Sequence, residues 1–372
     1  MFDADFLPPP DLLRCMVPHF ADPDVALVQA RWTHSNRGES VLTRVQAMQL
    51  DGHFLVEHLG RQSAGLLFNF NGTAGMLRRQ AVVDCGGWQS ETLTEDLDLS
   101  CRVQMAGWRF VFRPDLSVPG QLPESIGAYK AQQRRWTRGS AQTARKLLRP
   151  LWSSALPLRQ KLEASAMLLG NASYALLAIF AVAHALAWTT AEPASGLFGR
   201  FLDTGLLGAA TAVLWLFYAA ASVRADRGAL PALLEVPALI ALGAGMALNN
   251  GIAFLQGLFG GSAVFQRTPK NARGARDLGY RPELGPSLWL ELPASVGALV
   301  CAAVFVSRGW LGSGLFYSLF GVGLMYVGGL SVLELFEARR QRRIRSAVSA
   351  AQTGTYSTAT TQAFSSQTPA AR

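Results

Sequence analysis

The sequence predicts an α/β domain followed by interfacial helices and an α-helical transmembrane bundle. In residues 1–125, short apolar runs of strand length alternate with helical patterns, and residues 126–161 form a basic helical segment. Long apolar stretches follow in residues 162–337. The mean hydropathy of +0.19 and the hydrophobic content of 50% are too high for an ordinary soluble protein. We therefore expect part of the 372-residue chain to lie in a membrane.

The α/β prediction depends on short elements near the N-terminus. Val25–Gln29 and Trp108–Phe112 have the length and composition of strands, and Arg44–Gly60 has a helical pattern. The predicted helix contains His53 and His58, whose H-x-x-x-E-H spacing differs from that of zinc-binding motifs. A separation of five residues places two side chains on one helical face less well than a separation of four. We expect structural or solvent-exposed roles for both histidines.

An acidic stretch, Thr94-Glu95-Asp96-Leu97-Asp98, follows the glycine turn Gly86-Gly87-Trp88 and precedes an amphipathic run. This arrangement is typical of a helix start, where Thr94 would cap the helix and the acids would favour its dipole. Three carboxylates in five residues also suggest a catalytic role, because one of them can act in a cleft while the others stay structural. Both interpretations stay open on this stretch alone.

The next segment, residues 126–161, has the composition of amphipathic helices on a membrane surface. Tyr129, Trp136 and Leu147-Leu148 supply apolar contacts. Its basic residues would point toward lipid headgroups. They are Lys130, Arg134, Arg135, Arg138, Arg145, Lys146, Arg149, Arg159 and Lys161.

Four apolar stretches in residues 162–337 are long enough to cross a bilayer: 162–188, 204–223, 288–307 and 312–336. The stretch 231–260 is also long, but basic segments at 224–230 and 262–287 flank it. If both flanks lie on the cytoplasmic side, residues 231–260 cannot cross an odd number of times, so we expect a kinked interfacial or re-entrant helix. Residues 338–372 are first basic and then poor in large apolar side chains, which predicts a disordered tail.

The charge balance is strongly basic, with 34 Lys and Arg against 25 acids and a net charge of +9. No nucleic-acid motif accompanies the basic residues, and they cluster beside apolar runs. We expect a lipid bilayer and an anionic substrate as partners, and no nucleic acid. The four cysteines lack paired or metal-ligand spacing, which indicates free thiols in a reducing compartment.

Three further motifs have residue types suited to chemistry. The carboxylates of Asp3-Ala4-Asp5 can converge on a hard divalent cation, although a solvated acid pair is the simpler interpretation. Gln132-Gln133-Arg134-Arg135-Trp136 offers an amide, a guanidinium and an indole that suit a sugar and an anion, or a plain membrane-surface anchor. Phe265–Lys270 could close over a diphosphate, or serve only as a positive-inside loop.

Taken in order, these motifs resemble the processive, membrane-embedded family 2 glycosyltransferases, which include cellulose and hyaluronan synthases. The likeness is greatest to the cellulose-synthase-like glucomannan and β-mannan synthases, and it is dense from residue 1 to about residue 150. The matching segments are Phe2–Phe6, Leu27–Trp32, Phe70–Gly75, Gly86–Trp88, Thr94–Leu99, Leu122-Pro123, Gln132–Trp136 and Phe265–Lys270.

The resemblance implies roles for the acidic motifs. Asp5, with Asp3 beside it, would hold Mg²⁺ or Mn²⁺ against the diphosphate of a nucleotide-sugar donor. Asp96 would be the general base that takes a proton from the acceptor hydroxyl, giving an inverted, β-linked product. Three residues look like part of the acceptor wall: Asn71, Gly72 and Thr73.

The resemblance also implies roles for the other two motifs. Gln132, Arg135 and Trp136 would bind the acceptor terminus and the donor, with Trp136 stacked on a sugar. Thr268 and Lys270 match a gating loop, residues 262–287, that covers the nucleotide.

The expected activity is transfer of a hexose from UDP-glucose or GDP-mannose to a growing β-linked polysaccharide at the inner face of a membrane. The expected location is a bacterial inner (plasma) membrane, with the catalytic part and the C-terminus in the cytoplasm. In the resembling family the nucleotide-binding half of the GT-A domain precedes the segment that matches Phe2–Phe6. We therefore expect a truncated chain that is inactive alone, with residues 1–125 as the C-terminal part of that domain. The alternatives are a non-processive transferase to a lipid carrier and a non-enzymatic membrane subunit.

Overall fold

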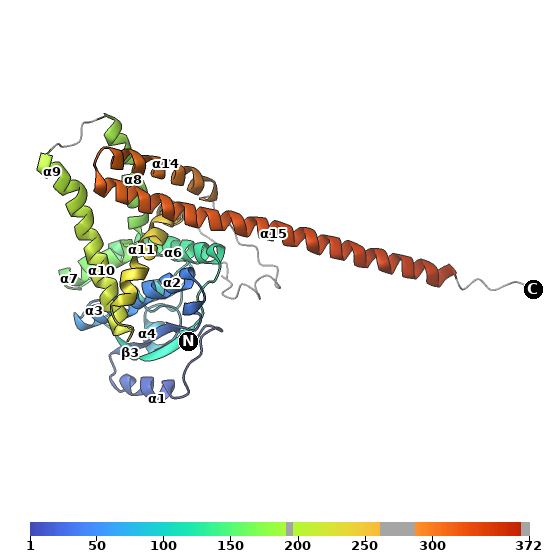
Figure 1. Ribbon diagram of the computed structural model, residues 1–372. Coiled ribbons are helices and arrows are strands. Elements are labelled where there is room, and N and C mark those ends of the chain that lie inside the picture. The colour runs from blue at the N-terminus through green and yellow to red at the C-terminus, as the bar shows by residue number, and fades with distance from the viewer. Residues whose placement is uncertain (191–195, 261–286, 366–372) are drawn as a thin grey trace, which may run out of the picture.

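A computed structural model describes residues 1–190, 196–260 and 287–365 (Figure 1). The N-terminal part is globular, and the helices that follow rise from it, with the last helix extending far beyond the body of the molecule (Figure 1). The predicted combination of an α/β part and a helical membrane part is confirmed.

The globular part contains a three-stranded mixed sheet in the order β2-β1-β3. The central strand β1 (Val25–His34) pairs in parallel with β3 (Arg109–Gly120) and antiparallel with β2 (Gly75–Leu77). The strands predicted at 25–29 and 108–112 are therefore confirmed, and both continue beyond the predicted ends. Bulges between β1 and β3 bend the pair near Ala30.

Short helices pack around this sheet. They are α1 (Leu12–Met16), η1 (Val17–Ala21), η2 (Arg37–Glu39), α2 (Val41–Gly52), η3 (His53–His58), α3 (Leu59–Ser63), α4 (Arg79–Asp84) and α5 (Glu95–Met105). Aromatic side chains fill the space between sheet and helices, including the buried rings of Phe54, Phe68, Phe70 and Phe112. Burial of such rings is the largest apolar contribution per residue to the stability of this part.

The long helix α6 (Ile126–Ser153) and the shorter α7 (Leu158–Leu169) cover the other side of α5. A surface helix was expected here, but α6 is enclosed on several sides and buries many polar residues. The ammonium of Lys130 lies 2.6 Å from the carboxylate of Glu291, with exposed side-chain fractions of 1% and 0%. Arg134 donates to Asn249 Oδ1 at 2.8 Å. Lys130 therefore does not face lipid headgroups, because membrane helices supply its partner.

Three helical stretches in the described ranges are long and apolar enough to cross a membrane: Gly196–Arg224, Leu288–Ser307 and Leu311–Gln341. The first comprises α9 (Gly196–Arg200), η4 (Phe201–Gly205) and α10 (Leu206–Arg224), the second is α14, and the third begins α15 (Leu311–Ser365). Two bent pairs would raise the number to five if each is one span.

The span expected at 162–188 differs from the structure. It is divided between α7 and α8 (Ala172–Thr190), which meet at an angle of 65°. The physical reason is that Ala164 and Leu168 of α7 are buried against Leu147 and Leu151 of α6, in the core of the globular part. Only α8 continues toward the membrane helices.

The second bent pair consists of α11 (Leu230–Gly245) and α12 (Ala247–Phe259), with 49° between them. Both of its ends contact the globular part or α6. Near the start, Glu235 lies 2.9 Å from Arg37. At the end, Arg145 of α6 donates to the carbonyl of Gly260 at 2.8 Å. The chain therefore leaves the globular part along α11 and returns to it along α12.

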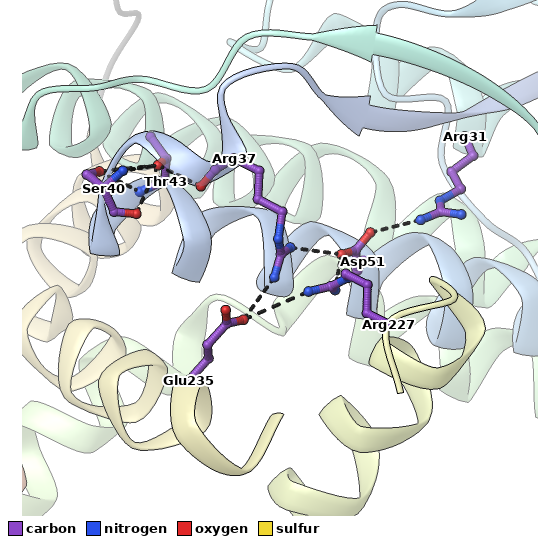
Figure 2. Close-up of polar contacts among 7 residues, drawn as sticks. All are labelled: Arg31, Arg37, Ser40, Thr43, Asp51, Arg227 and Glu235. Atoms are coloured by element: carbon purple, nitrogen blue, oxygen red, sulfur yellow. Dashed lines mark hydrogen bonds and ion pairs between the residues drawn. The ribbon is translucent and has the colours of Figure 1, made fainter. Parts of the chain in front are cut away.

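An ionic cluster joins the globular part to the turn between α10 and α11 (Figure 2). Asp51 of α2 accepts from Arg31 at 3.1 Å, from Arg37 at 3.3 Å and from Arg227 at 2.6 Å. Arg37 and Arg227 also approach Glu235 of α11. The basic segment 224–230 thus uses Arg227 to bind the globular part, and this contact fixes which end of α10 lies against it.

The C-terminal segment also differs from the expectation of disorder. After its membrane stretch, α15 continues without interruption to Ser365 and points away from the body (Figure 1). The reason lies in its composition, since residues 331–365 contain no proline and a single glycine, so that nothing ends the helix early.

Candidate functional site

The N-terminal acidic motif lies between a loop and the end of β3. The Asp3 amide donates to Thr73 Oγ1 at 2.8 Å, and Asp5 Oδ2 accepts from the Gln121 amide at 3.3 Å. Phe6 fits against Gly120, where an added Cβ would lie 2.7 Å from the ring. These contacts hold both carboxylates at the edge of the sheet, beside the loop 69–74.

The loop 69–74 is held by a buried glutamine of β1. Gln29, which is fully buried, donates through Nε2 to the carbonyls of Thr73 and Ala74 at 3.1 and 3.2 Å. This glutamine directly follows the apolar run Val25–Val28 within the strand, and a polar residue at that place is the sequence signal that could have identified it. Gly72 has a φ of +79°, a conformation that favours glycine. The loop therefore has a fixed shape in which Gly72 faces α5.

Asp96 lies in the first turn of α5, directly opposite Gly72. A Cβ added to Gly72 would lie 3.1 Å from Asp96 Oδ2. The other carboxylate oxygen, Oδ1, accepts from the Leu97 amide at 2.8 Å. Burial, and secondly the neighbouring charge of Glu95, raise the pKa of Asp96 to about 7. This carboxylate is therefore suited to take up a proton near neutral pH.

The expectation that Thr94 caps α5 is wrong. Its side chain makes no capping bond, and its Oγ1 lies 3.2 Å from Thr143 Oγ1 of α6. Gly139 of α6 lets the two segments approach closely, since an added Cβ would lie 2.5 Å from Thr94 Cγ2. Thr94 is thus used to dock the start of α5 onto α6.

Charged residues reinforce this docking. Lys146 of α6 lies 2.9 Å from Asp98 and 2.8 Å from Glu91, and Asp98 also pairs with Arg102 at 2.7 Å. Asp98 is fully buried, so its role is structural, as the sequence suggested. The interpretation of Lys146 as a membrane-facing cation is wrong, because α5 and the preceding loop supply its partners.

Arg135, from the Gln132–Trp136 motif of α6, lies near the acidic residues. It lies three helical turns before Lys146 and therefore on the same face of α6. Burial lowers its pKa, while the charges of Asp96, Glu95 and Asp3 act in the opposite direction. The guanidinium thus lies within electrostatic range of both the proposed base and the N-terminal acidic motif.

Gln132 and Trp136 lie one turn apart on the same face of α6. Together with Phe6, Trp32 and Gln121 they line a small cavity of about 20 Å³. Phe6 and Trp32 meet edge to face, with ring centroids 5.1 Å apart. The cavity therefore joins the N-terminal acidic motif, the central strand and α6.

The structure brings most of the residues singled out in the sequence to one place. Asp3, Thr73, Gly72 and Asp96 form a continuous series of contacts, with Arg135 in range. The side chain of Asn71 is engaged away from Asp96, because its Nδ2 lies 3.0 Å from His53 Nε2. Thr268 and Lys270 lie outside the described residues.

Asp3 and Asp5 are the two carboxylates of the N-terminal acidic motif that could bind a metal ion. Within the ranges that the structure covers, no group of three or more His, Cys, Asp and Glu side chains could hold one. This donor set is consistent with Mg²⁺ or Mn²⁺, because Mg²⁺ is usually held by one or two carboxylates together with substrate phosphates and water.

Comparison with known protein families identifies the fold. Residues 1–191 match the family described as "Glycosyl transferase family group 2", which is just over half of the chain. The chain belongs to this family. The family membership inferred from the ordered motifs is thereby confirmed, and the apolar helices identify a membrane protein.

Three similar proteins are described as glucomannan 4-beta-mannosyltransferases. Glucomannan 4-beta-mannosyltransferase 1 of Oryza sativa subsp. japonica is 46% identical over 149 residues, which cover 40% of this chain and 29% of that protein. Glucomannan 4-beta-mannosyltransferase 2 of Arabidopsis thaliana is 46% identical over 149 residues, covering 40% of this chain and 28% of that protein. Glucomannan 4-beta-mannosyltransferase 1 of Cyamopsis tetragonoloba is 43% identical over 165 residues, covering 44% and 31%. The chain thus aligns with less than a third of each relative.

Proposed function

We propose that the protein containing this chain is an inverting glycosyltransferase that transfers a hexose from a nucleotide sugar to the end of a β-linked polysaccharide. The observation that supports this most directly is Asp96, a carboxylate with a pKa of about 7 that lies close to Gly72 and interacts electrostatically with Arg135. A base with this pKa is half ionised near neutral pH, where proton transfer from a sugar hydroxyl is most effective.

The proposed reaction is a single displacement. The acceptor hydroxyl attacks the anomeric carbon while the bond from that carbon to the donor's diphosphate breaks, and Asp96 takes the hydroxyl proton. The diphosphate departs toward Asp3 and Asp5, which would hold the divalent cation, and toward Arg135. The cation would neutralise the charge that develops on the leaving diphosphate. Attack from the opposite side inverts the configuration and gives a β-linkage.

The acceptor end is assigned to the face of α6 that carries Gln132 and Trp136. Trp136 presents an indole on which a sugar ring can stack, and Gln132 adds an amide for its hydroxyls. The donor is a UDP-hexose or a GDP-hexose, with UDP-glucose and GDP-mannose as the two candidates. The reaction takes place at the inner face of a membrane, since Arg227 and Asp51 join a basic turn to the globular part.

The test uses membranes that carry the full-length protein, supplied with labelled UDP-glucose or GDP-mannose. Asp96→Asn should reduce incorporation by roughly 10²–10⁴-fold, the usual contribution of a general base. Asp84→Asn is the control, because Asp84 is an exposed carboxylate that bonds only within α4, to Gln80. In the unsubstituted protein, incorporation should fall below about pH 7, where Asp96 is protonated.

Two results would contradict the proposal. Equal incorporation by Asp96→Asn and Asp84→Asn would remove Asp96 as the base. A product that is soluble in organic solvent and of fixed size would replace the polysaccharide acceptor with a lipid carrier.

A further inference from the structure

Two histidines for which the sequence indicated no catalytic role, His53 and His58, contact each other and the loop 69–74. The segment η3 (His53–His58) is a π-helix, in which hydrogen bonds join residues five apart. The His53 and His58 rings therefore lie on one face, with centroids 4.3 Å apart. The expectation that a spacing of five separates them is wrong, because it assumed an α-helix. His58 is completely buried, which fits the structural one of the two roles expected for it.

A line of hydrogen bonds leads from η3 to the loop. His53 Nδ1 lies 3.0 Å from Glu57 Oε2, and His53 Nε2 lies 3.0 Å from Asn71 Nδ2. Although burial raises the pKa of Glu57, the bond to His53 and the charge of Arg61 lower it overall, so Glu57 is ionised. The carboxylate can only accept, which requires a proton on Nδ1. His53 Nε2 then accepts from the Asn71 amide.

The second histidine holds the start of the same loop. His58 Nε2 lies 2.9 Å from the carbonyl of Asn69 and can donate to it. The loop is thereby bound at Asn69 and Asn71, just before Gly72 approaches Asp96. A shift of the loop at Asn71 would open the space between Gly72 and the carboxylate.

We propose that His53 is a positioning residue for the proposed base: Glu57 fixes its tautomer, its Nε2 holds Asn71, and the held loop covers the Oδ2 side of the partly exposed Asp96 and limits the access of water to it. The effect on catalysis rests on the proposed function, whereas the positioning of the loop by His53 does not. The charged groups that act on Asp96 are Glu95 beside it and Arg135 on α6, and the loop contributes no charge of its own.

The consequence concerns the environment of Asp96. Its pKa is raised chiefly by burial, so water admitted by a displaced loop would lower that pKa toward the ordinary value for aspartate. Activity would then persist to lower pH, while the rate at neutral pH would fall because the base is weaker and the acceptor less well placed. A loss of global stability alone would not move the acid limb of the pH profile.

The experiment compares His53→Leu, which removes the contact, with His53→Gln, whose amide can still accept from Asn71. His19→Leu is the control, because His19 contacts Arg113 in another part of the globular domain. Hydrogen exchange is measured on the peptide 69–75 in the full-length protein, and kcat, KM and the pH profile are measured with the nucleotide sugar.

For His53→Leu we expect faster exchange in the peptide 69–75, a fall in kcat of roughly tenfold or more, and an acid limb displaced downward by about one pH unit. The KM for the nucleotide sugar should stay close to that of the unsubstituted protein. His53→Gln and His19→Leu should keep the original exchange and the original acid limb.

Unchanged exchange in His53→Leu would overturn the inference, as would an acid limb that does not move. The exchange measurement needs no turnover. If the unsubstituted protein uses neither donor, the proposed function fails, and exchange still decides whether His53 holds the loop.

Discussion

Two ionic connections join the globular part to the membrane helices, and they are built differently. The first is a single pair between Lys130 of α6 and Glu291 of α14, at 2.6 and 2.8 Å, with both side chains almost fully buried. Ser331 of α15 accepts a further hydrogen bond from the ammonium, at 3.2 Å. Because water does not reach these side chains, each charge is stabilised mainly by the other.

The second connection is the cluster around Asp51 (Figure 2). Three guanidinium groups form ion pairs with this carboxylate. Two of them, those of Arg37 and Arg227, also form ion pairs with Glu235. The arginine side chains are 15–23% exposed, so water reaches them. The comparison indicates that the buried pair has no substitute for a lost partner, whereas the cluster can redistribute its contacts. The buried pair should therefore be the more sensitive of the two.

The largest effect is expected for Glu291→Leu. It leaves the Lys130 ammonium buried without its carboxylate, which should cost about 3–5 kcal/mol of folding free energy. For a protein of this size the melting temperature in detergent should fall by roughly 10 °C. Burial lowers the pKa of Lys130, so the native state binds fewer protons than the unfolded state and stability rises with pH. The difference in melting temperature between Glu291→Leu and the unsubstituted protein should therefore become smaller at alkaline pH.

The matched control is the double variant Lys130→Met/Glu291→Leu. It removes both charges and keeps apolar volume, so most of the lost stability should return. A double variant that is as unstable as Glu291→Leu would show that shape, and not charge, matters at this contact.

An intermediate effect is expected for Asp51→Asn. The substitution weakens three ion pairs at once, but water can solvate the partly exposed arginines, so the cost should be about 2 kcal/mol. The melting temperature should fall less than in Glu291→Leu, and the difference from the unsubstituted protein should diminish in high salt, where surface charges are screened. A fall as large as that of Glu291→Leu would contradict the contrast between the two connections.

Part of this molecule follows from its sequence because the signals are local. The strands at 25–29 and 108–112 are visible as short apolar runs, and the α5 acids follow a glycine turn. The order of the motifs identified the family before any contact was known. Asp96 could be selected among three neighbouring carboxylates only through the family resemblance, whereas the ion pair of Asp98 with Arg102 became visible in the structure.

The remaining contacts could not be predicted, because they join residues that are far apart in the chain. Lys130 and Glu291 are separated by 161 positions, and Asp51 and Arg227 by 176. A basic residue beside an apolar helix has the same local pattern whether it meets a headgroup or a buried carboxylate. The π-helix was missed for a related reason, since hydrophobic periodicity assumes 3.6 residues per turn.

The smallest effect is expected for Glu235→Gln, and it tests whether the cluster is a true network. When Glu235 alone is neutralised, Arg37 and Arg227 retain their ion pairs with Asp51, so the loss of folding free energy should be about 0.5–1 kcal/mol. In the Asp51→Asn background Glu235 is the remaining carboxylate of the cluster, and its neutralisation should cost more. A double-mutant cycle on melting temperatures measures this difference. Strictly additive losses would mean that the two carboxylates act independently and that the contacts of the cluster are not redistributed.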